Sequence, residues 1–302
     1  MTLARRIEHP VRSTALGAVF VLAAASLSPL SAQMVERFDA DPLTGQSRNA
    51  FIGEGDVASR FTFLADEPSH FPGDHDGTLR VVYDTTLPTA RLSTSTGQVF
   101  SVDADFDFGA ILTIRSGGFF ADPNGFSQIA FGLWNAARTG LNRTSFPSDS
   151  FDLVEFDYFP NVTAFGGPFV SPSVFGGNVA DNAFFNFAFN SAETMLPLDV
   201  PLLVQCHYNA ALRRLNVGVS RSLRSLIFER IGAATVTVDL SRIDPTFLVN
   251  TAGIAAYFEG YPSIHAVVDY DLLFTGPLPS PWSVVRTRTG VASVGTRNAA
   301  AD

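Results

Sequence analysis

The regular alternation of apolar and polar residues along many short segments constrains this chain more than any other feature. A period of two is typical of β-strands that bury one face. The alternating segments cover residues 78–84, 102–114, 126–134, 151–159, 183–190, 201–208, 213–220, 252–258 and 265–274. Turn-forming sequences separate them, and only residues 222–231 show the apolar spacing of a helix. The sequence therefore predicts an all-β fold, a jelly-roll β-sandwich of two antiparallel sheets.

The two ends of the chain lack this alternation. Residues 1–33 begin with arginines, continue with an apolar run over residues 15–27 and end with small residues, which is the order of a secretory signal peptide. Because that run is shorter than the about 20 residues that span a bilayer, we expect a secreted product, extracellular or periplasmic, with no membrane span in the mature protein. We expect one domain over residues 34–276 and a disordered C-terminal tail over residues 277–302, which are rich in Pro, Gly, Ser and Ala.

Charge and motif content disfavour several classes of function. The chain carries 29 acidic and 20 basic residues, a formal net charge of −9, which argues against nucleic acid as a partner. Cys206 is the single cysteine, so no internal disulfide is expected. Cys206 and His207 are adjacent in a predicted strand, so their side chains point to opposite faces and cannot form a catalytic dyad.

One short apolar stretch, FDLVEFDYFPN at residues 151–161, contains Glu155, Asp157 and Asn161, although carboxylates are depleted in strands. Three interpretations account for them: they hydrogen-bond loop amides at the end of a sheet, they hold a metal ion, or they act on a sugar bond. In a strand the Glu155 and Asp157 side chains share one face, about 6.5–7 Å apart. That spacing keeps a glycoside hydrolase open, because such enzymes use two carboxyl groups.

The catalytic interpretation meets an obstacle in the next residues. Jelly-roll glucanases, the laminarinases and lichenases, carry a similar Glu-x-Asp-x-x-Glu pattern on one strand. Pro160 stands here at the position of the second glutamate, so one of the two catalytic carboxylates is missing. An enzyme is therefore the less favoured interpretation, with a glucanase-like glycoside hydrolase or a polysaccharide lyase as the alternative function.

The stretch EFDYFPN (155–161) resembles the metal-binding loop of the L-type (legume-type) lectins, in the concanavalin A-like lectin/glucanase superfamily. Weaker similarity extends over roughly residues 36–275. The resemblance implies a concanavalin A-like sandwich that binds carbohydrate. It also implies a Ca²⁺ ion held by Asp157, the backbone carbonyl of Phe159 and the side chain of Asn161, with Glu155 and Asp157 facing a second metal. Calcium takes six to eight oxygen ligands, which these groups can begin to supply.

Two departures from the family pattern limit what the resemblance implies about metals. The loop after Asn161 lacks the family's early aspartate, and Phe184 stands where its metal-binding histidine would fall, so we do not expect a transition metal. Calcium stays a candidate cofactor if Asp181 or Asn178 completes its coordination.

A second candidate calcium site lies at Asp269. Residues 36–42 and 268–274 are expected to be neighbouring edge strands, and VDYDLLF (268–274) resembles the closing strand of glucanases that often bind a structural calcium there. The alternative is an ordinary acidic strand edge, which resists edge-to-edge pairing.

Two surfaces are candidates for sugar binding. By the resemblance, Asp122 is the loop aspartate, Asn161 the calcium-held amide, and Phe159 or Phe165 the ring that stacks on the sugar. The sequence DPNG at Asp122 is also a strong turn on its own. The second surface follows a strand end and consists of Trp134, Asn135, Asn142 and Arg143. Trp134 is equally compatible with a place in the core.

The sequence thus predicts a secreted, lectin-like and non-catalytic carbohydrate-binding protein whose partner is a glycan or polysaccharide. Besides the hydrolase or lyase, a third interpretation is a structural or adhesive surface protein that binds other proteins. The pattern specifies neither the sugar nor the oligomeric state.

Overall fold

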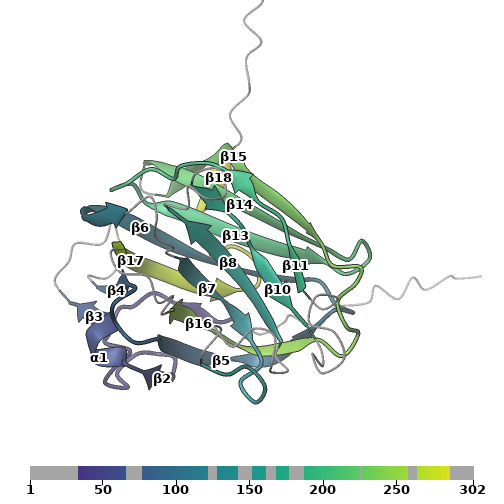
Figure 1. The fold of residues 1–302 in the computed structure, drawn as a ribbon, viewed down its shortest axis with the longest axis horizontal. Coiled ribbons are helices and arrows are strands. Elements are labelled where there is room, and N and C mark those ends of the chain that lie inside the picture. Colours follow the sequence, from purple (N-terminus) through teal and green to yellow (C-terminus); the bar gives the residue numbers. More distant parts are fainter. Residues whose placement is uncertain are drawn as a thin grey trace, which may run out of the picture. The chain divides into compact units, whose positions relative to one another are not determined.

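The computed structural model describes residues 33–65, 77–121, 128–141, 152–160, 168–176, 187–224, 226–257 and 264–285. These residues form two large β-sheets, and the one helix among them is the short α1 (Val57–Arg60). Figure 1 shows the result, a jelly-roll β-sandwich of two mainly antiparallel sheets, which is the fold class that the alternation predicts. No helix in this described part of the chain is long and apolar enough to cross a membrane. The predicted signal peptide lies outside the described residues, and it stays a prediction.

Sheet A contains both described ends of the chain. Its strands are β1 (Val35–Glu36), β3 (Phe61–Leu64), β4 (Thr78–Asp84), β6 (Phe106–Ala121), β13 (Leu202–Asn209), β14 (Arg214–Arg224), β15 (Ile227–Asp239), β17 (Ile264–Thr275) and β18 (Ser283–Val285). They are ordered β18-β15-β14-β13-β6-β17-β4-β3, and β1 pairs with β17. The pairings are antiparallel except for the parallel pair β15–β18.

Sheet B carries the candidate site. Its strands are β2 (Phe51–Gly55), β5 (Ala90–Ser101), β7 (Ile129–Trp134), β8 (Leu153–Phe159), β9 (Phe169–Val170), β10 (Ser173–Phe175), β11 (Phe187–Phe189), β12 (Ala192–Glu193) and β16 (Leu248–Ala256). The main path runs β11-β10-β8-β7-β16-β5-β2, and β9 pairs with β8 and β12.

The two sheets pack face to face through one large hydrophobic core. At its centre, Phe131 of β7 lies with its ring centroid 5.3 Å from Phe156 of β8, and 6.3 Å from both Phe108 of β6 and Tyr270 of β17. The contacts to Phe108 and Tyr270 join the two sheets in edge-to-face geometry, which adds about 0.5–1.5 kcal/mol per pair beyond area burial. Period-two alternation therefore produces the sandwich, because each strand sends every second side chain into this layer.

Most predicted strands match observed ones, and the predicted segments 201–208 and 213–220 form the antiparallel pair β13–β14. The helix expected over residues 222–231 is wrong. That segment ends β14 and begins β15, with Arg221 opposite Glu229 and Ser222 opposite Phe228. The apolar spacing is explained instead by burial of Phe228 on the outer face of sheet A.

The chain after residue 276 also differs from expectation. Residues 277–285, which we call the C-terminal strap, cross sheet A and end in β18. Trp282 of the strap is only 7% exposed and packs in a second apolar cluster with Phe228 and Phe274. The guanidinium of Arg37 lies 5.0 Å from the centre of the Trp282 ring. The sequence missed this strap because its apolar residues are separated by prolines and show no sustained alternation. Residues 286–302 lie outside the described part.

Candidate functional site

Strand β8 directs Glu155 and Asp157 to the outer face of sheet B. Its other alternating residues, Val154, Phe156 and Tyr158, belong to the core between the sheets. Both carboxylates are nevertheless fully buried, at 0% exposure each. The predicted sharing of one face is therefore confirmed. Burial of two acids away from the core is the least expected property of this strand.

Hydrogen bonds from neutral groups hold both acids in place. The amide Nε2 of Gln128 donates to Asp157 Oδ1 at 2.6 Å. The hydroxyl of Tyr257 donates to Glu155 Oε1. The backbone N–H of Ser171 donates to the backbone carbonyl of Asp157 at 2.9 Å. A buried carboxylate is costly unless it accepts such bonds, so Gln128 and Tyr257 are structural parts of the acid pair.

Glycines on the strands next to β8 leave space that neighbouring side chains occupy on this face of the sheet. Glu155 is opposite Gly132 of β7, and Gly132 is in turn opposite Gly253 of β16. A Cβ atom at Gly132 would lie 2.8 Å from Glu155 Cα, and one at Gly253 would lie 2.5 Å from Trp134 Cη2. Glycine is needed at both positions because the acid and the indole fill the space that a side chain would take.

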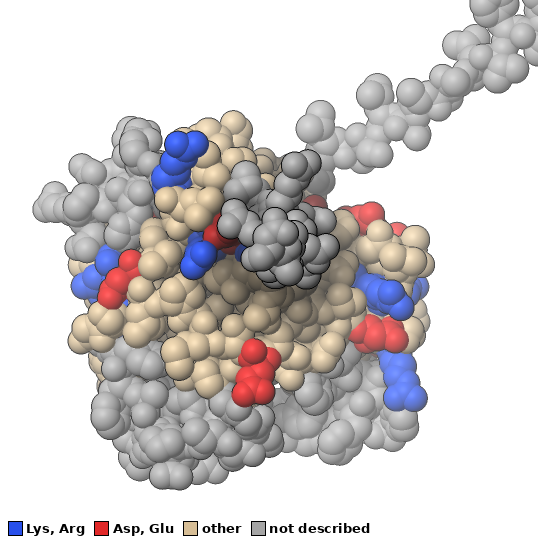
Figure 2. Space-filling model, turned by 90° about the horizontal axis from the view of Figure 1, so that it is seen from above, with Lys and Arg blue, Asp and Glu red and all other residues tan. Residues whose placement is uncertain are grey.

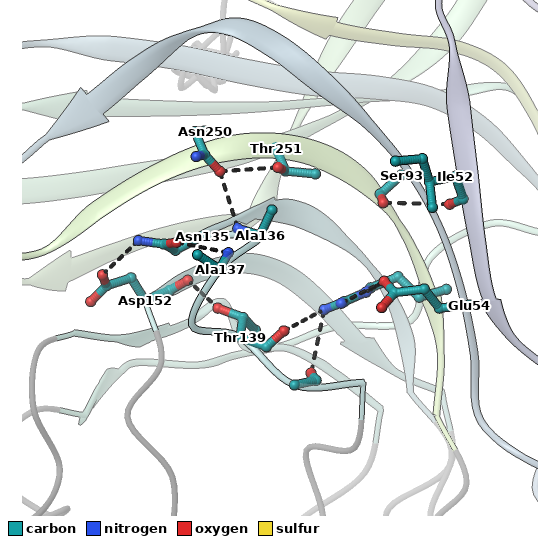
Figure 3. A network of polar contacts seen from close by, with 12 residues as sticks. Ile52, Glu54, Ser93, Asn135, Ala136, Ala137, Thr139, Asp152, Asn250 and Thr251 are labelled. Atoms are coloured by element: carbon teal, nitrogen blue, oxygen red, sulfur yellow. Dashed lines mark hydrogen bonds and ion pairs between the residues drawn. The ribbon is translucent and has the colours of Figure 1, made fainter.

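A hollow of about 310 Å³ adjoins this row of glycines, and we call it the Trp134 hollow. Its lining residues are Ile52, Glu54, Arg91, Ser93, Thr94, Ser95, Trp134, Ala136, Asn250 and Thr251. The Arg91 guanidinium stacks on the Trp134 ring, 4.9 Å from its centroid, and Arg91 Nε donates to Glu54 Oε2 at 2.7 Å. Among the lining residues, Figure 3 labels Ile52 and Glu54 of β2, Ser93 of β5, Asn250 and Thr251 of β16, and Ala136 in the turn after β7. The hollow thus offers a carboxylate, a guanidinium, an amide and several hydroxyls beside an aromatic ring.

The turn after β7 forms one wall of this hollow, and Asn135 holds it. Asn135 Oδ1 accepts the N–H of Ala137 at 3.1 Å, while Asn135 Nδ2 lies 3.4 Å from Asp152 Oδ2. Asn250 Oδ1 accepts the N–H of Ala136 at 3.1 Å (Figure 3). Asn135 is only 4% exposed, so the structure gives it the role of positioning the turn.

Two of the predicted ring contacts can be located. Trp134 is 1% exposed. One side of its ring packs with Leu153 and Phe175, as in a core position, and the face that Arg91 covers borders the hollow. Phe159 is 6% exposed and stacks on Phe169 with centroids 4.9 Å apart. The other predicted ligands Asp122, Asn142, Arg143, Asn161, Phe165, Asn178 and Asp181 lie outside the described residues.

Asp269 lies in a different environment from the one expected for a calcium ligand. Its Oδ1 and Oδ2 accept from Arg80 Nε and Nη2 at 2.7 and 2.9 Å, and Oδ2 also contacts Arg115 Nε. The expected neighbouring strands do pair, with Val35 opposite Phe274. However, β17 lies inside sheet A, between β6 and β4. Two guanidinium groups thus neutralise Asp269, which favours a structural role, and calcium at this position stays a prediction.

The described residues only partly fit a calcium ion at β8. They bring together no group of three or more His, Cys, Asp or Glu side chains able to hold a metal. Glu155 and Asp157 contribute two carboxylates, and the Gln128 amide carries an oxygen acceptor as well as its donor. Since calcium takes six to eight oxygens, the remaining ligands would have to come from the Phe159 carbonyl, Asn161, and Asp181 or Asn178.

Sequence reasoning missed Gln128, Tyr257, Arg91 and Glu54. Gln128 and Tyr257 lie inside stretches recognised as strands, but nothing local indicates that they reach the acids on β8. Arg91 and Glu54 come from β5 and β2, whose Ser-, Thr- and Gly-rich sequences lack apolar alternation. The predicted separation of Cys206 and His207 is confirmed: burial raises the pKa of the Cys206 thiol, while His207 faces outward against Asp107.

Comparisons with known proteins give structural likeness only. No family model matches the chain, and no curated protein matches it. Peanut lectin with a 9mer peptide is similar at 13% identity over 82% of this chain and 99% of that one, with a TM-score of 0.44. A Lotus tetragonolobus seed lectin is similar at 12% identity over 82% and 100%, with a TM-score of 0.48. A carbohydrate esterase from the bacteriophage phi24B is similar at 10% identity over 74% and 88%, with a TM-score of 0.40. Values this low assign neither a family nor a function.

Proposed function

We propose that this protein is a secreted, non-catalytic carbohydrate-binding protein that holds a glycan or polysaccharide on the outer face of sheet B. The observation that carries the proposal is the Trp134 hollow, where Glu54, Arg91 and Asn250 converge with serine and threonine hydroxyls beside an indole ring. A sugar presents hydroxyls that donate and accept hydrogen bonds, and such sites combine a few fixed polar groups with apolar surface. The polar side chains of the hollow meet the first need, and Ile52, which lines the hollow and is 67% exposed, supplies apolar surface beside them.

Calcium has a defined place in this proposal. Asp157, the Phe159 carbonyl, Asn161 and Asp181 would hold the ion beside Glu155, and its charge would fix the loop that follows β8. The residues of this chain do the rest: Gln128 and Tyr257 orient the two acids, and the Trp134 hollow contacts the sugar.

The state of the acid pair favours binding over glycoside hydrolysis. Hydrolysis requires two carboxyl groups that reach the glycosidic bond. Glu155 and Asp157 are both 0% exposed, and Tyr257 and Gln128 lie against them. The acids therefore serve the fold and the candidate ion rather than a reacting sugar.

The test is a glycan and polysaccharide array probed with purified protein, in calcium and again in EDTA. The variants are Glu54→Gln in the Trp134 hollow and Asp157→Asn at β8, and the matched control is Asp103→Asn, whose side chain is 76% exposed and lies outside the hollow. We expect a narrow set of bound sugars, at least about tenfold weaker binding for Glu54→Gln from the loss of a charged hydrogen-bonding group, and no change for Asp103→Asn. Absence of any bound glycan would reject the function. If glycan binding is unchanged in EDTA, the calcium site is rejected and the carbohydrate-binding function stands.

A further inference from the structure

We propose that the outer face of sheet A carries a second site for a neutral oligosaccharide, so that one chain binds two carbohydrate segments on opposite faces. The inference extends the proposed function to a surface that shares no residue with the Trp134 hollow. It begins with four strands, β6, β13, β14 and β15, whose outward side chains are polar at aligned positions.

Register places these polar side chains in rows across the strands. Asp107 is opposite His207, His207 is opposite Asn216, and Asn216 is opposite Thr237. The imidazole Nδ1 of His207 lies 2.8 Å from Asp107 Oδ1, and Thr237 Oγ1 donates to Asn216 Oδ1 at 2.9 Å. Polar groups that hold each other across strands are already arranged before a ligand arrives, which reduces the entropy lost on binding.

Beside these rows lies a hollow of about 450 Å³, which we call the Arg230 hollow. It is lined by Asp107, Gln205, His207, Asn216, Val217, Gly218, Arg230 and Thr235. Arg230 folds across Gly218, so close that a Cβ atom at Gly218 would collide with its guanidinium, and Arg230 Nη2 donates to Gln205 Oε1 at 3.2 Å. The volume falls within the roughly 300–1,000 Å³ of small-molecule sites.

The charges of the Arg230 hollow favour a neutral ligand. Besides the imidazole of His207, its lining has one positive group, Arg230, and one negative group, Asp107, so an anion or a cation would meet a like charge. The remaining polar groups are amides and a hydroxyl, each able to donate and accept, which matches the hydroxyls of a sugar. Figure 2 shows one face of the molecule, on which the described acidic and basic side chains are scattered among uncharged residues and form no broad single-sign patch.

A second hollow lies at the margin of the core between the sheets, against which Leu198 and Ile231 pack. It measures about 640 Å³, shares Arg230 with the Arg230 hollow, and is also lined by Met195, Leu198 and Ile231. Met195 is 75% exposed, which is unusual for a large apolar side chain. Arg221 and Glu229 also line it and pair with each other at 2.8 Å, leaving its charge balanced.

The test separates this site from sheet B by working in the Asp157→Asn background. Laminarin, xylan and dextran serve as neutral probes and alginate as a charged one, with affinity measured by calorimetry on the full-length chain. We expect residual binding of a neutral polysaccharide to Asp157→Asn, weakened at least about tenfold by Asn216→Ala or Arg230→Met. The matched control Gln46→Ala removes an exposed amide that lines neither hollow and should leave the affinity unchanged. Melting temperatures of both sheet A variants identify any loss of folding.

A second readout follows from having two sites. Wild-type protein should cross-link a soluble neutral polysaccharide and raise turbidity, whereas Asn216→Ala should bind through sheet B without cross-linking. If Asp157→Asn abolishes all binding, or if the residual binding is indifferent to Asn216→Ala and Arg230→Met, the second site is wrong while the sheet B function stands. Binding of alginate alone would overturn the neutral class of ligand.

Discussion

The guanidinium of Arg91 lies 4.9 Å from the centroid of the Trp134 ring and covers the face that borders the sheet B hollow. Arg91 is itself held by Glu54 and by the carbonyl of Thr139 at 3.2 Å. Strand β5 is therefore tied through one side chain to the strand and turn that carry Trp134. The other tryptophan of the chain, Trp282, is covered by Arg37 in a similar way.

Arg91→Ala is expected to expose the Trp134 ring. In a Trp282→Phe background, where Trp134 is the only tryptophan, its emission should shift to longer wavelength in the Arg91→Ala variant. The free energy of unfolding should fall by about 1–3 kcal/mol, because a stacked cation and its hydrogen bonds are lost. Arg91→Lys keeps the positive charge but loses the planar guanidinium. Its emission wavelength and its free energy of unfolding should therefore lie between those of Arg91→Ala and of the protein with Arg91 intact. An unchanged emission spectrum would show that Arg91 does not shield the ring in solution.

The C-terminal strap is expected to stabilise the domain. Trp282→Ala should lower the free energy of unfolding by about 3–5 kcal/mol, since it empties an apolar cluster on sheet A. Deletion of residues 277–302 should cost at least as much in a thermal melt. The matched control ends the chain after Val285 and keeps Trp282 and β18. Equal melting temperatures for the two truncations would contradict the strap's role.

Gly132→Ala is expected to disturb the acid pair through the backbone. The new Cβ would collide with the carbonyl of Val154 and lie 2.8 Å from Glu155 Cα, atoms that cannot rotate away. Overpacking of this kind costs about 1–3 kcal/mol. Gly232→Ala is the control, because nothing lies within 4 Å of its Cβ position. Chemical denaturation of both variants makes the comparison, and similar losses would refute the close contact at Gly132.

Stability should depend on Asp84 in the acidic range. Burial raises the pKa of Asp84, but hydrogen bonds from the Thr86 hydroxyl and N–H, and from His265, outweigh it and lower the pKa below the ordinary 3.8. A lowered pKa in the folded state contributes stability above the ordinary value, and this contribution disappears as the pH falls through the folded value. The stability difference between wild type and Asp84→Asn should therefore shrink as the pH falls from about 4 to about 2. A constant difference in urea melts across that range would count against the assignment.

Strands β4, β8 and β5 show how much of the fold can be predicted from the sequence. Alternation predicts β4 at Thr78–Asp84 with its observed bounds, and it places Glu155 and Asp157 of β8 on one face. It fails for β5, because a strand rich in serine and threonine has no apolar period to detect. Whether such a segment forms a strand depends on its pairing with neighbouring strands in the folded protein.

The site was less predictable than the fold, for a geometric reason. Tyr257 reaches Glu155 across 102 residues of sequence, and Arg91 meets Glu54 across 37. Those meetings depend on the order of strands in sheet B, which alternation does not encode. Each strand is predicted locally, whereas its neighbours follow from the whole packing.

The place of β17 in sheet A sets when the chain can fold. This strand is formed by Ile264–Thr275, yet it pairs with β6, β4 and β1, whose residues are synthesised much earlier. Until β17 emerges, β6 and β4 have no shared neighbour and sheet A stays in two parts. Contacts between such distant segments also form slowly. Sheet A is therefore expected to be completed only late in synthesis, after β17 has emerged.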